Sequence, residues 1–196
     1  MRIIAGEWKG AKIFAGNFPD LRPLTDRIKE SLFGILGDEV VTATVLDLYA
    51  GVGSFGLEAL SRGAEKAVFV EHARPVAALL RKNLEKLRCP PTRYRILVKD
   101  VWKALHLLAA EGFQYDIVFA DPPFREKVGL RLLQVLARTP LLRRGGLFVL
   151  RHQSEEQVAE RFSPFHLWRQ KKYGDSVVKF YRSLANDDNS HLSRNL

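Results

Sequence analysis

The chain has 196 residues, 46% of them hydrophobic, and a formal net charge of +9. This length suits one α/β domain with a short extension. No apolar run approaches the ~18 residues of a membrane-spanning helix, and the first residues lack the apolar core of a signal peptide. The single cysteine, Cys89, excludes an internal disulfide and a cysteine metal cluster. We therefore expect a cytoplasmic protein without a bound metal, and a monomer, because no helix looks apolar on two faces.

The positive charge is unevenly distributed along the chain. Lys and Arg outnumber Asp and Glu most clearly in residues 74–103 and 161–182. Clustered positive charge is typical of proteins that bind nucleic acid, although solvated helix faces give the same composition. We favour contact with nucleic acid.

The first 18 residues are predicted to form a small β-hairpin. Residues 2–5 and 11–14 would be its two sides, with Gly6 and Gly10 at the connection. This extension could bind RNA, because lysines on a hairpin contact phosphates without reading the base sequence.

A helix is predicted to follow this extension. Thr25 is a typical N-cap for a helix over Asp26–Leu36, and Gly37 is a typical stop.

From residue 44 onward, strand-like and helix-like segments alternate, which predicts a doubly wound, mostly parallel sheet. The expected strands are 44–49, 66–71, 94–99, 115–120 and 146–152, and the expected helices are 55–62, 74–87, 101–111, 126–138 and 155–161. Residues 164–173 and 176–184 are expected to form a final antiparallel pair, which makes a seven-stranded sheet in a domain over residues 19–184. The polar residues 185–196 are expected to form a disordered tail.

A glycine-rich loop follows the first expected strand. Gly51, Gly53 and Gly56 form a G-x-G-x-x-G pattern between strand and helix, where the backbone can approach a ligand closely. Glu71 ends the next strand, where a carboxylate can accept both hydroxyls of an adenosine ribose. Asp100 ends the third strand and can accept a hydrogen bond from an adenine amine.

This pattern also fits a dinucleotide-binding oxidoreductase, which places glycines and an acid at the same spacing. Asp47 argues against that alternative, because it lies inside the first strand, where a bound pyrophosphate has no use for a negative charge. A negative charge there would instead suit a cofactor that carries an ammonium and a sulfonium. His72 is expected to border the adenine pocket.

The fourth expected strand ends in Asp121-Pro122-Pro123-Phe124. Two prolines cannot continue a central strand, and they fix a stiff strand end. A carboxylate and a carbonyl there can accept both hydrogens of an exocyclic amine, and the aromatic ring can stack on a nucleobase. An ordinary turn followed by a core phenylalanine would have the same sequence.

Taken together, these strand ends resemble the class I S-adenosylmethionine-dependent methyltransferases that modify exocyclic amines of nucleobases. Four segments, which span much of residues 1–184, resemble the bacterial 16S ribosomal RNA guanine-N2 methyltransferase family: MRIIAG (1–6), RPLTDRIKESLF (22–33), LDLYAG (46–51) and GLEALSRG (56–63). Val52 and Leu24 depart from the usual residues of that family.

The resemblance implies a Rossmann-like fold, S-adenosylmethionine as cofactor, and 16S ribosomal RNA or the assembled small subunit as substrate. It implies catalytic roles for Asp121, Pro122, Pro123 and Phe124. It implies cofactor contacts for Thr25, Asp47, Ala50, Gly51, Gly53, Glu71, His72, Asp100 and Val101. It implies RNA contacts for Lys9, Lys12, Arg22 and Arg27. Methylation of another amine, such as adenine N6 in DNA or RNA, stays open, because the same tetrapeptide serves it.

Overall fold

The computed structural model describes residues 1–16, 18 and 24–184 of the chain. Its helices are α1 (Asp26–Leu36), α2 (Ser54–Ser61), α3 (Arg74–Lys86), α4 (Val101–Ala110) and α5 (Gly129–Arg138). Its strands are β1 (Thr44–Leu48), β2 (Lys66–Val70), β3 (Tyr94–Leu97), β4 (Tyr115–Ala120), β5 (Leu142–Gln153), β6 (Arg161–Phe162), β7 (Phe165–Tyr173) and β8 (Ser176–Ser183). Short 3-10 helices cover η1 (Gly37–Val40), η2 (Pro91–Arg93) and η3 (Phe124–Glu126).

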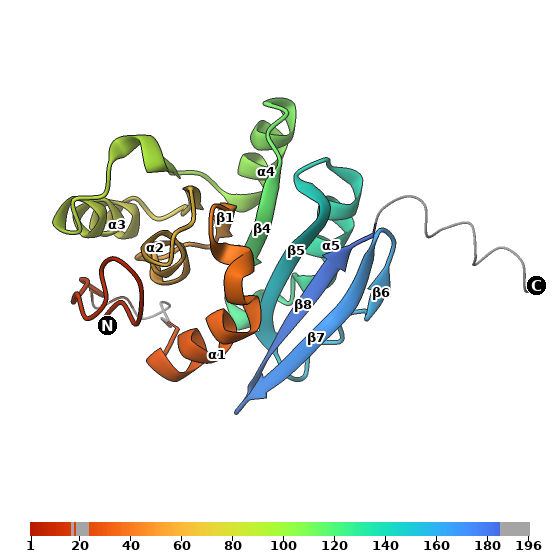
Figure 1. Cartoon of the computed structure of the whole chain (residues 1–196). Helices are drawn as coiled ribbons and strands as arrows, with labels where there is room; N and C mark the ends of the chain where they lie inside the picture. Colours follow the sequence, from red (N-terminus) through yellow and green to blue (C-terminus); the bar gives the residue numbers. More distant parts are fainter. Residues whose placement is uncertain (17, 19–23, 185–196) are drawn as a thin grey trace, which may run out of the picture.

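The strands form one sheet in the order β3-β2-β1-β4-β5-β8-β7-β6 (Figure 1). Strands β1 to β5 pair in parallel, whereas β8 is antiparallel to β5 and β7 is antiparallel to β8. The predicted parallel sheet with an antiparallel end is confirmed.

The chain reverses its winding direction at β1, because β2 and β3 lie on one side of β1 and β4 lies on the other. In open α/β sheets, ligands bind at the carboxyl ends of the strands beside such a switch point. The topology therefore places a ligand site at the ends of β1 and β4.

Helices cover both faces of the sheet (Figure 1). Because side chains alternate along a strand, Val45 of β1 packs in the cluster that includes residues of α1, α2 and α3. The next residue, Leu46, packs in the cluster that includes residues of α4 and α5. Strands that are apolar on both faces explain the continuous hydrophobic runs in the sequence.

Helix α1 has the bounds that the sequence predicts. The Thr25 side chain accepts a hydrogen bond from the Ile28 N–H at 3.3 Å, and Gly37 ends the helix at φ 54°. The cap and the stop are thus confirmed.

The helix predicted at 155–161 is wrong. This part of the chain leads instead into β6, a short strand that gives the sheet eight strands where seven were predicted. Side chains from β8 donate hydrogen bonds to backbone carbonyls of residues 155–161. Lys179 Nζ donates to the Val158 carbonyl at 2.6 Å, and the Tyr181 hydroxyl donates to the Ala159 carbonyl at 2.8 Å. These contacts tie the segment to β8 in a non-helical form.

The first 13 residues pair with each other in the antiparallel sense, but form no regular strand. The Ile3 N–H donates to the Ala11 carbonyl and the Gly10 N–H donates to the Ile3 carbonyl, both at 2.9 Å. A single bridge joins Arg2 and Lys12. The predicted hairpin is therefore present in a minimal form.

This N-terminal segment is docked on α2. The amides of Ile4 and Ala5 donate to the two carboxylate oxygens of Glu58 at 2.9 and 3.1 Å. A Cβ on Gly6 would lie 1.7 Å from the Ser61 carbonyl oxygen, so only glycine allows this approach.

A second anchor of the segment is on α3. Buried Asn83 accepts a hydrogen bond from the Phe14 N–H at 2.7 Å and donates to the Phe14 carbonyl at 2.9 Å. It also donates to the Val52 carbonyl at 3.1 Å, and so joins the segment to the glycine-rich loop.

Glu58 also belongs to a buried group of charges. Its side chain accepts a hydrogen bond from Arg62 Nε at 2.8 Å, and Lys29 Nζ lies 3.6 Å from it. Lys29 and Glu58 are both fully buried. Lys29 also donates to the Arg2 carbonyl, which draws α1, α2 and the N-terminal segment together.

Within residues 1–16, 18 and 24–184, no helix has the length and apolar character needed to cross a membrane. The predicted RNA contact Arg22 and the predicted disordered tail, 185–196, lie outside the residues that the structure describes.

Candidate active site

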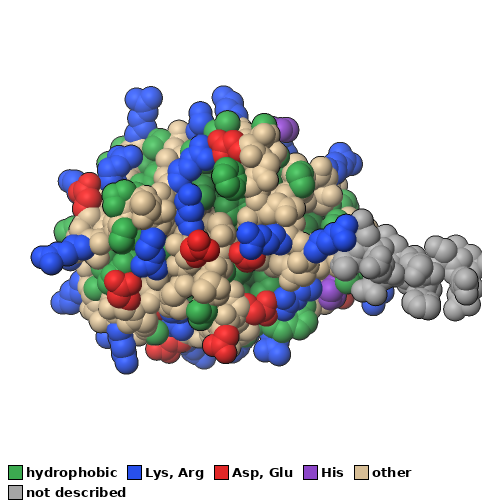
Figure 2. Space-filling view, turned by 45° about the horizontal axis from the view of Figure 1, so that its top comes forward, with side chains coloured by type: hydrophobic (Ala, Val, Ile, Leu, Met, Phe, Trp, Pro, Cys, Tyr) green, Lys and Arg blue, Asp and Glu red, His purple; other side chains and the backbone are tan. Residues whose placement is uncertain are grey.

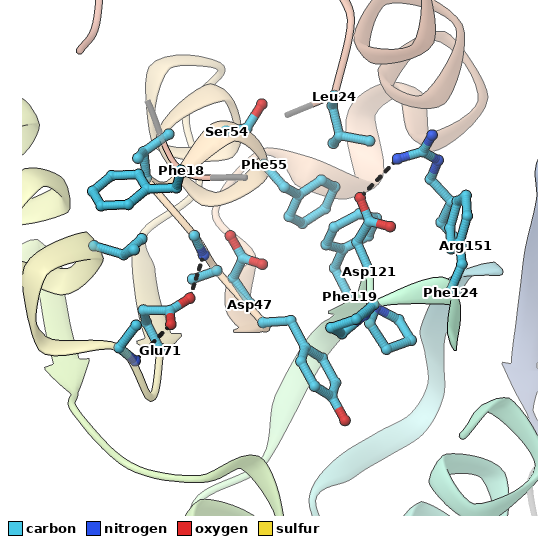
Figure 3. Close-up of a pocket in the computed structure, with 18 of the residues that line it drawn as sticks. Phe18, Leu24, Asp47, Ser54, Phe55, Glu71, Phe119, Asp121, Phe124 and Arg151 are labelled. Carbon is cyan, nitrogen blue, oxygen red and sulfur yellow. Dashed lines mark hydrogen bonds and ion pairs between the residues drawn. The ribbon is translucent and has the colours of Figure 1, made fainter. Parts of the chain in front are cut away.

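A cavity of about 680 Å³ lies at the carboxyl ends of the parallel strands. Its walls come from the segments that follow β1, β2 and β4, from the end of β5 and from the β7–β8 turn. Figure 3 shows Glu71 and Phe18 at one side, Asp121 and Arg151 at the other, and Asp47 between them. The topological switch point therefore carries a cavity with acidic groups.

The first wall is the turn from β1 into α2. Tyr49 and Gly51 adopt the left-handed backbone conformation, at φ 60° and 56°, which turns the chain sharply at the strand end. The Gly51 N–H donates to Glu71 Oε2 at 2.9 Å, and the Ala73 N–H donates to Glu71 Oε1 at 2.8 Å. Backbone amides of two loops thus hold the Glu71 carboxylate at the cavity wall.

Asp47 lies at the base of this wall and is only 1% exposed. Its Oδ2 accepts a hydrogen bond from the Gly56 N–H at 2.9 Å, the one hydrogen bond to this carboxylate within the described part of the chain. Burial raises the pKa of Asp47 to about 8, and the nearby charges of Asp121 and Glu71 add to the rise. A buried acid with this environment suits a cationic ligand.

The third glycine of the loop has a packing role. A Cβ on Gly56 would lie 2.2 Å from the ring of Phe69 on β2. Glycine therefore lets α2 sit close to the sheet, where the Gly56 amide reaches Asp47.

Asp47→Asn should stabilise the free protein, and the gain should grow with pH. The pKa of about 8 lies above the ordinary 3.8, so between these values the folded state holds a proton that the unfolded chain has lost. The free energy of unfolding of the wild type therefore falls across this interval as the pH rises. Thermal melts should show a melting-temperature difference between the variant and the wild type that widens from pH 5 to pH 8.5. A constant difference would contradict the buried, proton-binding state of Asp47.

The second wall is formed by residues 121–124 and the end of β5. Arg151 Nη1 donates to Asp121 Oδ2 at 3.0 Å, and the guanidinium carbon lies 5.1 Å from the centroid of the Phe124 ring. Burial raises the pKa of Asp121 to about 6, although the ion pair with Arg151 opposes the rise. At neutral pH this wall presents a carboxylate beside an aromatic ring.

Aromatic rings form an apolar part of the lining between the two walls. Phe55 and Phe119 stack with a centroid separation of 4.0 Å, and Phe33 of α1 stacks on Phe55 at 5.1 Å. Beside them, the buried Ser54 Oγ and Tyr49 hydroxyl have no hydrogen-bond partner within the described residues. Both residues line the cavity.

The structure brings most of the predicted site residues to this cavity. These are Asp47, Ala50, Gly51, Glu71, His72, Asp121, Pro122, Pro123 and Phe124. Their roles stay predictions, but their convergence from the ends of three strands, β1, β2 and β4, follows from the parallel topology.

Four predicted cofactor contacts are not among the residues that line the cavity: Thr25, Gly53, Asp100 and Val101. Thr25 and Asp100 are N-caps, and the Asp100 carboxylate accepts from the amides of Trp102 and Lys103 at 3.1 and 3.3 Å. Val101 is buried against the sheet. Gly53, at φ 91°, ends the turn before α2.

The predicted RNA contacts Lys9, Lys12 and Arg27 are exposed, as RNA binding requires. On the face shown in Figure 2, Lys and Arg side chains are spread widely, with Asp and Glu between them. This face carries no single cationic patch, so the RNA contacts stay a prediction.

The sequence interpretation missed Arg151, Phe18, Leu24 and Asp175, which all line the cavity. Arg151 left a signal, since it is a cation directly after the apolar run of the fifth strand, at the same kind of position as Glu71 and Asp121. Phe18, Leu24 and Asp175 reach the cavity from segments that carry no comparable pattern.

Comparison with known proteins identifies relatives of similar length. The family model described as Conserved hypothetical protein 95 matches residues 1–182. Ribosomal RNA small subunit methyltransferase D of Escherichia coli (strain K12) is 36% identical over 185 residues, which are 94% of this chain and 91% of that protein. The protein of the same name from Haemophilus influenzae is 35% identical over 160 residues, 81% of each chain.

Solved structures of related proteins have a similar fold. The Escherichia coli protein yhhF matches with a TM-score of 0.83 at 33% identity, over 95% of this chain and 99% of that one. An RNA methyltransferase from Salinibacter ruber, in complex with S-adenosyl-L-homocysteine, matches over 84% of this chain and 95% of that one, with a TM-score of 0.63. At 16% identity this second likeness shows the shared fold alone. The chain belongs to the family described as Conserved hypothetical protein 95 and is a relative of the ribosomal RNA small subunit methyltransferase D proteins, as the resemblance predicted.

Proposed function

We propose that this protein transfers a methyl group from S-adenosylmethionine to the exocyclic N2 amine of a guanine in 16S ribosomal RNA. The observation that carries the proposal is one cavity that joins two walls. One wall has Asp47, Gly51 and Glu71, and the other has Asp121 and Phe124. The names of the relatives support ribosomal RNA of the small subunit as the substrate class.

The first wall fits S-adenosylmethionine, which supplies a methyl group on a sulfonium when bound. Asp47 is a buried acid without a cationic partner among the described residues, and it suits the ammonium and sulfonium charges. Each Glu71 oxygen accepts one backbone hydrogen bond, which leaves each a lone pair for a ribose hydroxyl. The unpartnered Ser54 Oγ offers a further polar contact.

The second wall fits the amine. Arg151 donates to Asp121 Oδ2, and no described residue donates to Oδ1. That oxygen would therefore accept one N–H of the base, and the Pro122 carbonyl would accept the other. These two bonds favour a pyramidal nitrogen and stabilise the positive charge that develops on it. The nitrogen lone pair forms the bond to the methyl carbon as the carbon–sulfur electron pair leaves with the sulfur. The nitrogen then loses one proton to Asp121 or to water.

Positioning would supply much of the rate, because correct orientation is worth ~7–11 kcal/mol. Phe124 would stack on a base that has left its helix. Leaving the helix costs about a few kcal/mol, and less in an RNA loop than in a duplex. We further propose that the protein acts as a cytoplasmic monomer on 16S ribosomal RNA or on the assembled small subunit.

The test is transfer of labelled methyl from S-adenosylmethionine to small-subunit particles that lack the modification. Naked 16S RNA and duplex DNA serve as parallel acceptors, and nucleoside analysis identifies the product. Label in N2-methylguanosine would support the proposal. Label in adenine would keep the chemistry and overturn the acceptor, whereas no transfer together with binding of a nicotinamide cofactor would overturn the class.

Replacing Lys9 and Lys12 by Glu should weaken RNA binding and flatten its salt dependence. Each phosphate contact that is lost should lower the slope of log K against log salt by roughly 0.7–0.9. Filter binding at several salt concentrations measures this slope. Lys66→Glu is the control, because Lys66 is exposed at the amino end of β2, away from the cavity. Equal slopes for the double variant and the wild type would remove the N-terminal segment from the RNA contact surface.

A further inference from the structure

We infer that Arg151 is a positioning residue, which holds Asp121 and the ring of Phe124 in the arrangement that receives the amine. This inference rests on the proposed function, because it concerns the same amine site. Neither the glycine-rich loop nor the tetrapeptide at 121–124 points to an arginine at this place. It comes from a different strand, β5, that pairs in parallel with β4.

The contacts of Arg151 span the whole second wall. Its Nη1 donates to Asp121 Oδ2 at 3.0 Å, and its guanidinium lies over the Phe124 ring at 5.1 Å. Figure 3 shows the guanidinium reaching Asp121 from the edge of the cavity. One side chain thus contacts both the first and the last residue of the tetrapeptide, and fixes how the carboxylate and the ring lie relative to each other.

Arg151 is itself held in place from β8. Its Nε donates to the Ser176 Oγ at 3.3 Å, and the Ser176 hydroxyl donates to the Tyr173 carbonyl at 3.1 Å. The Arg151 side chain is only 10% exposed, so it is not a freely moving surface arginine. The β7–β8 turn therefore supports the amine site through this arginine.

The ion pair also leaves the chemistry of Asp121 intact. Arg151 bonds one carboxylate oxygen through a single nitrogen, and within the described residues no hydrogen bond uses the other oxygen, which can accept from the amine. A bidentate pair would have used both oxygens, as Arg95 does with Glu111 on the protein surface. Arg151 thus holds the Asp121 carboxylate in place through Oδ2 and makes no hydrogen bond to Oδ1.

The charge of Arg151 keeps Asp121 ionised. The charged or titratable groups that line the described part of the cavity with Asp121 are Asp47, Tyr49, Glu71, His72, Arg125, Arg151 and Asp175. Burial raises the pKa of Asp121 to about 6, and the charge of Arg151 and its hydrogen bond oppose that rise. Without Arg151 that pKa would rise further, so the carboxylate would be protonated near neutral pH and would lose its acceptor role.

The experiment compares Arg151→Met and Arg151→Lys with the wild type. Methyl transfer under single-turnover conditions is measured from pH 5 to pH 9, and affinity for S-adenosylmethionine is measured by calorimetry. In the Met variant we expect transfer at pH 7 to fall roughly 10–100-fold, the acid-side midpoint to move up by about one pH unit or more, and affinity to change little. Lys should restore the midpoint but not the full rate, because it keeps the charge and lacks the planar fork.

Arg143→Met is the matched control. Arg143 pairs with Asp116 at 2.7 Å, at the amino end of β4, and its loss should leave the midpoint unchanged.

A readout without turnover separates this inference from the proposed function. Carbon-13 NMR of labelled aspartate side chains, assigned with Asp121→Asn, should show the Asp121 titration move to higher pH in Arg151→Met. If neither the titration nor the pH profile moves in Arg151→Met, the inference is overturned. If the titration moves but the wild type methylates no RNA, the proposed function fails while the role of Arg151 toward Asp121 stands.

Discussion

Asp121→Asn should lower the rate of methyl transfer by roughly 10²–10³-fold, the loss typical when one stabilising hydrogen-bond partner of a developing charge is removed. The amide keeps the size of the carboxylate, but its charge is gone. Affinity for S-adenosylmethionine should change little, because Asp121 belongs to the amine wall. Single-turnover transfer and calorimetry, measured on the same preparation, separate the two effects.

The pH profile of the wild type supplies a second check on Asp121. Its pKa is raised to about 6 by burial, so transfer should fall as the pH drops through that value and the carboxylate takes up a proton. Asp116→Asn is the matched control, since Asp116 starts the same strand and pairs with Arg143 far from the cavity. Full turnover by the Asp121 variant would remove this residue from the mechanism.

Glu58→Ala should lower the free energy of unfolding by about 3–5 kcal/mol, the usual cost of breaking a buried ion pair from one side. The substitution leaves Lys29 fully buried without its nearest buried carboxylate, and it orphans the amides of Ile4 and Ala5. Urea unfolding followed by circular dichroism measures the loss.

Glu30→Ala is the control for this substitution. Glu30 is exposed on α1, beside Lys29 in the sequence, and its replacement should change the unfolding free energy by less than about 0.5 kcal/mol. A similar small loss in Glu58→Ala would mean that the N-terminal segment does not depend on this buried carboxylate.

The sequence predicted those parts of the site that sit at strand ends. Parallel strands bring their carboxyl ends to one edge, so Asp47, Glu71 and Asp121 had to converge once the alternation was recognised. Helix α1 was predicted to the residue because its cap and its stop are local signals.

The parts that escaped prediction depend on contacts between distant segments. The stretch 155–161 looks helical by composition, but contacts from Lys179 and Tyr181 of β8 tie it down in a non-helical form. The position of Arg151 after an apolar run was a usable signal, but the support that its guanidinium receives from Ser176 depends on the pairing of β8 with β5. Pairings of this kind have no local sequence pattern.

The two hydrogen bonds between Asn83 and the Phe14 backbone limit when this part of the chain can fold. The two residues are 69 positions apart, and a ribosome that adds ~5–20 residues per second needs roughly 3–14 s to cover that distance. During this interval α3 is incomplete, and the backbone of Phe14 lacks the Asn83 side chain that binds it. Residues 1–14 therefore cannot complete their contacts with α3 until the chain has been made as far as Asn83.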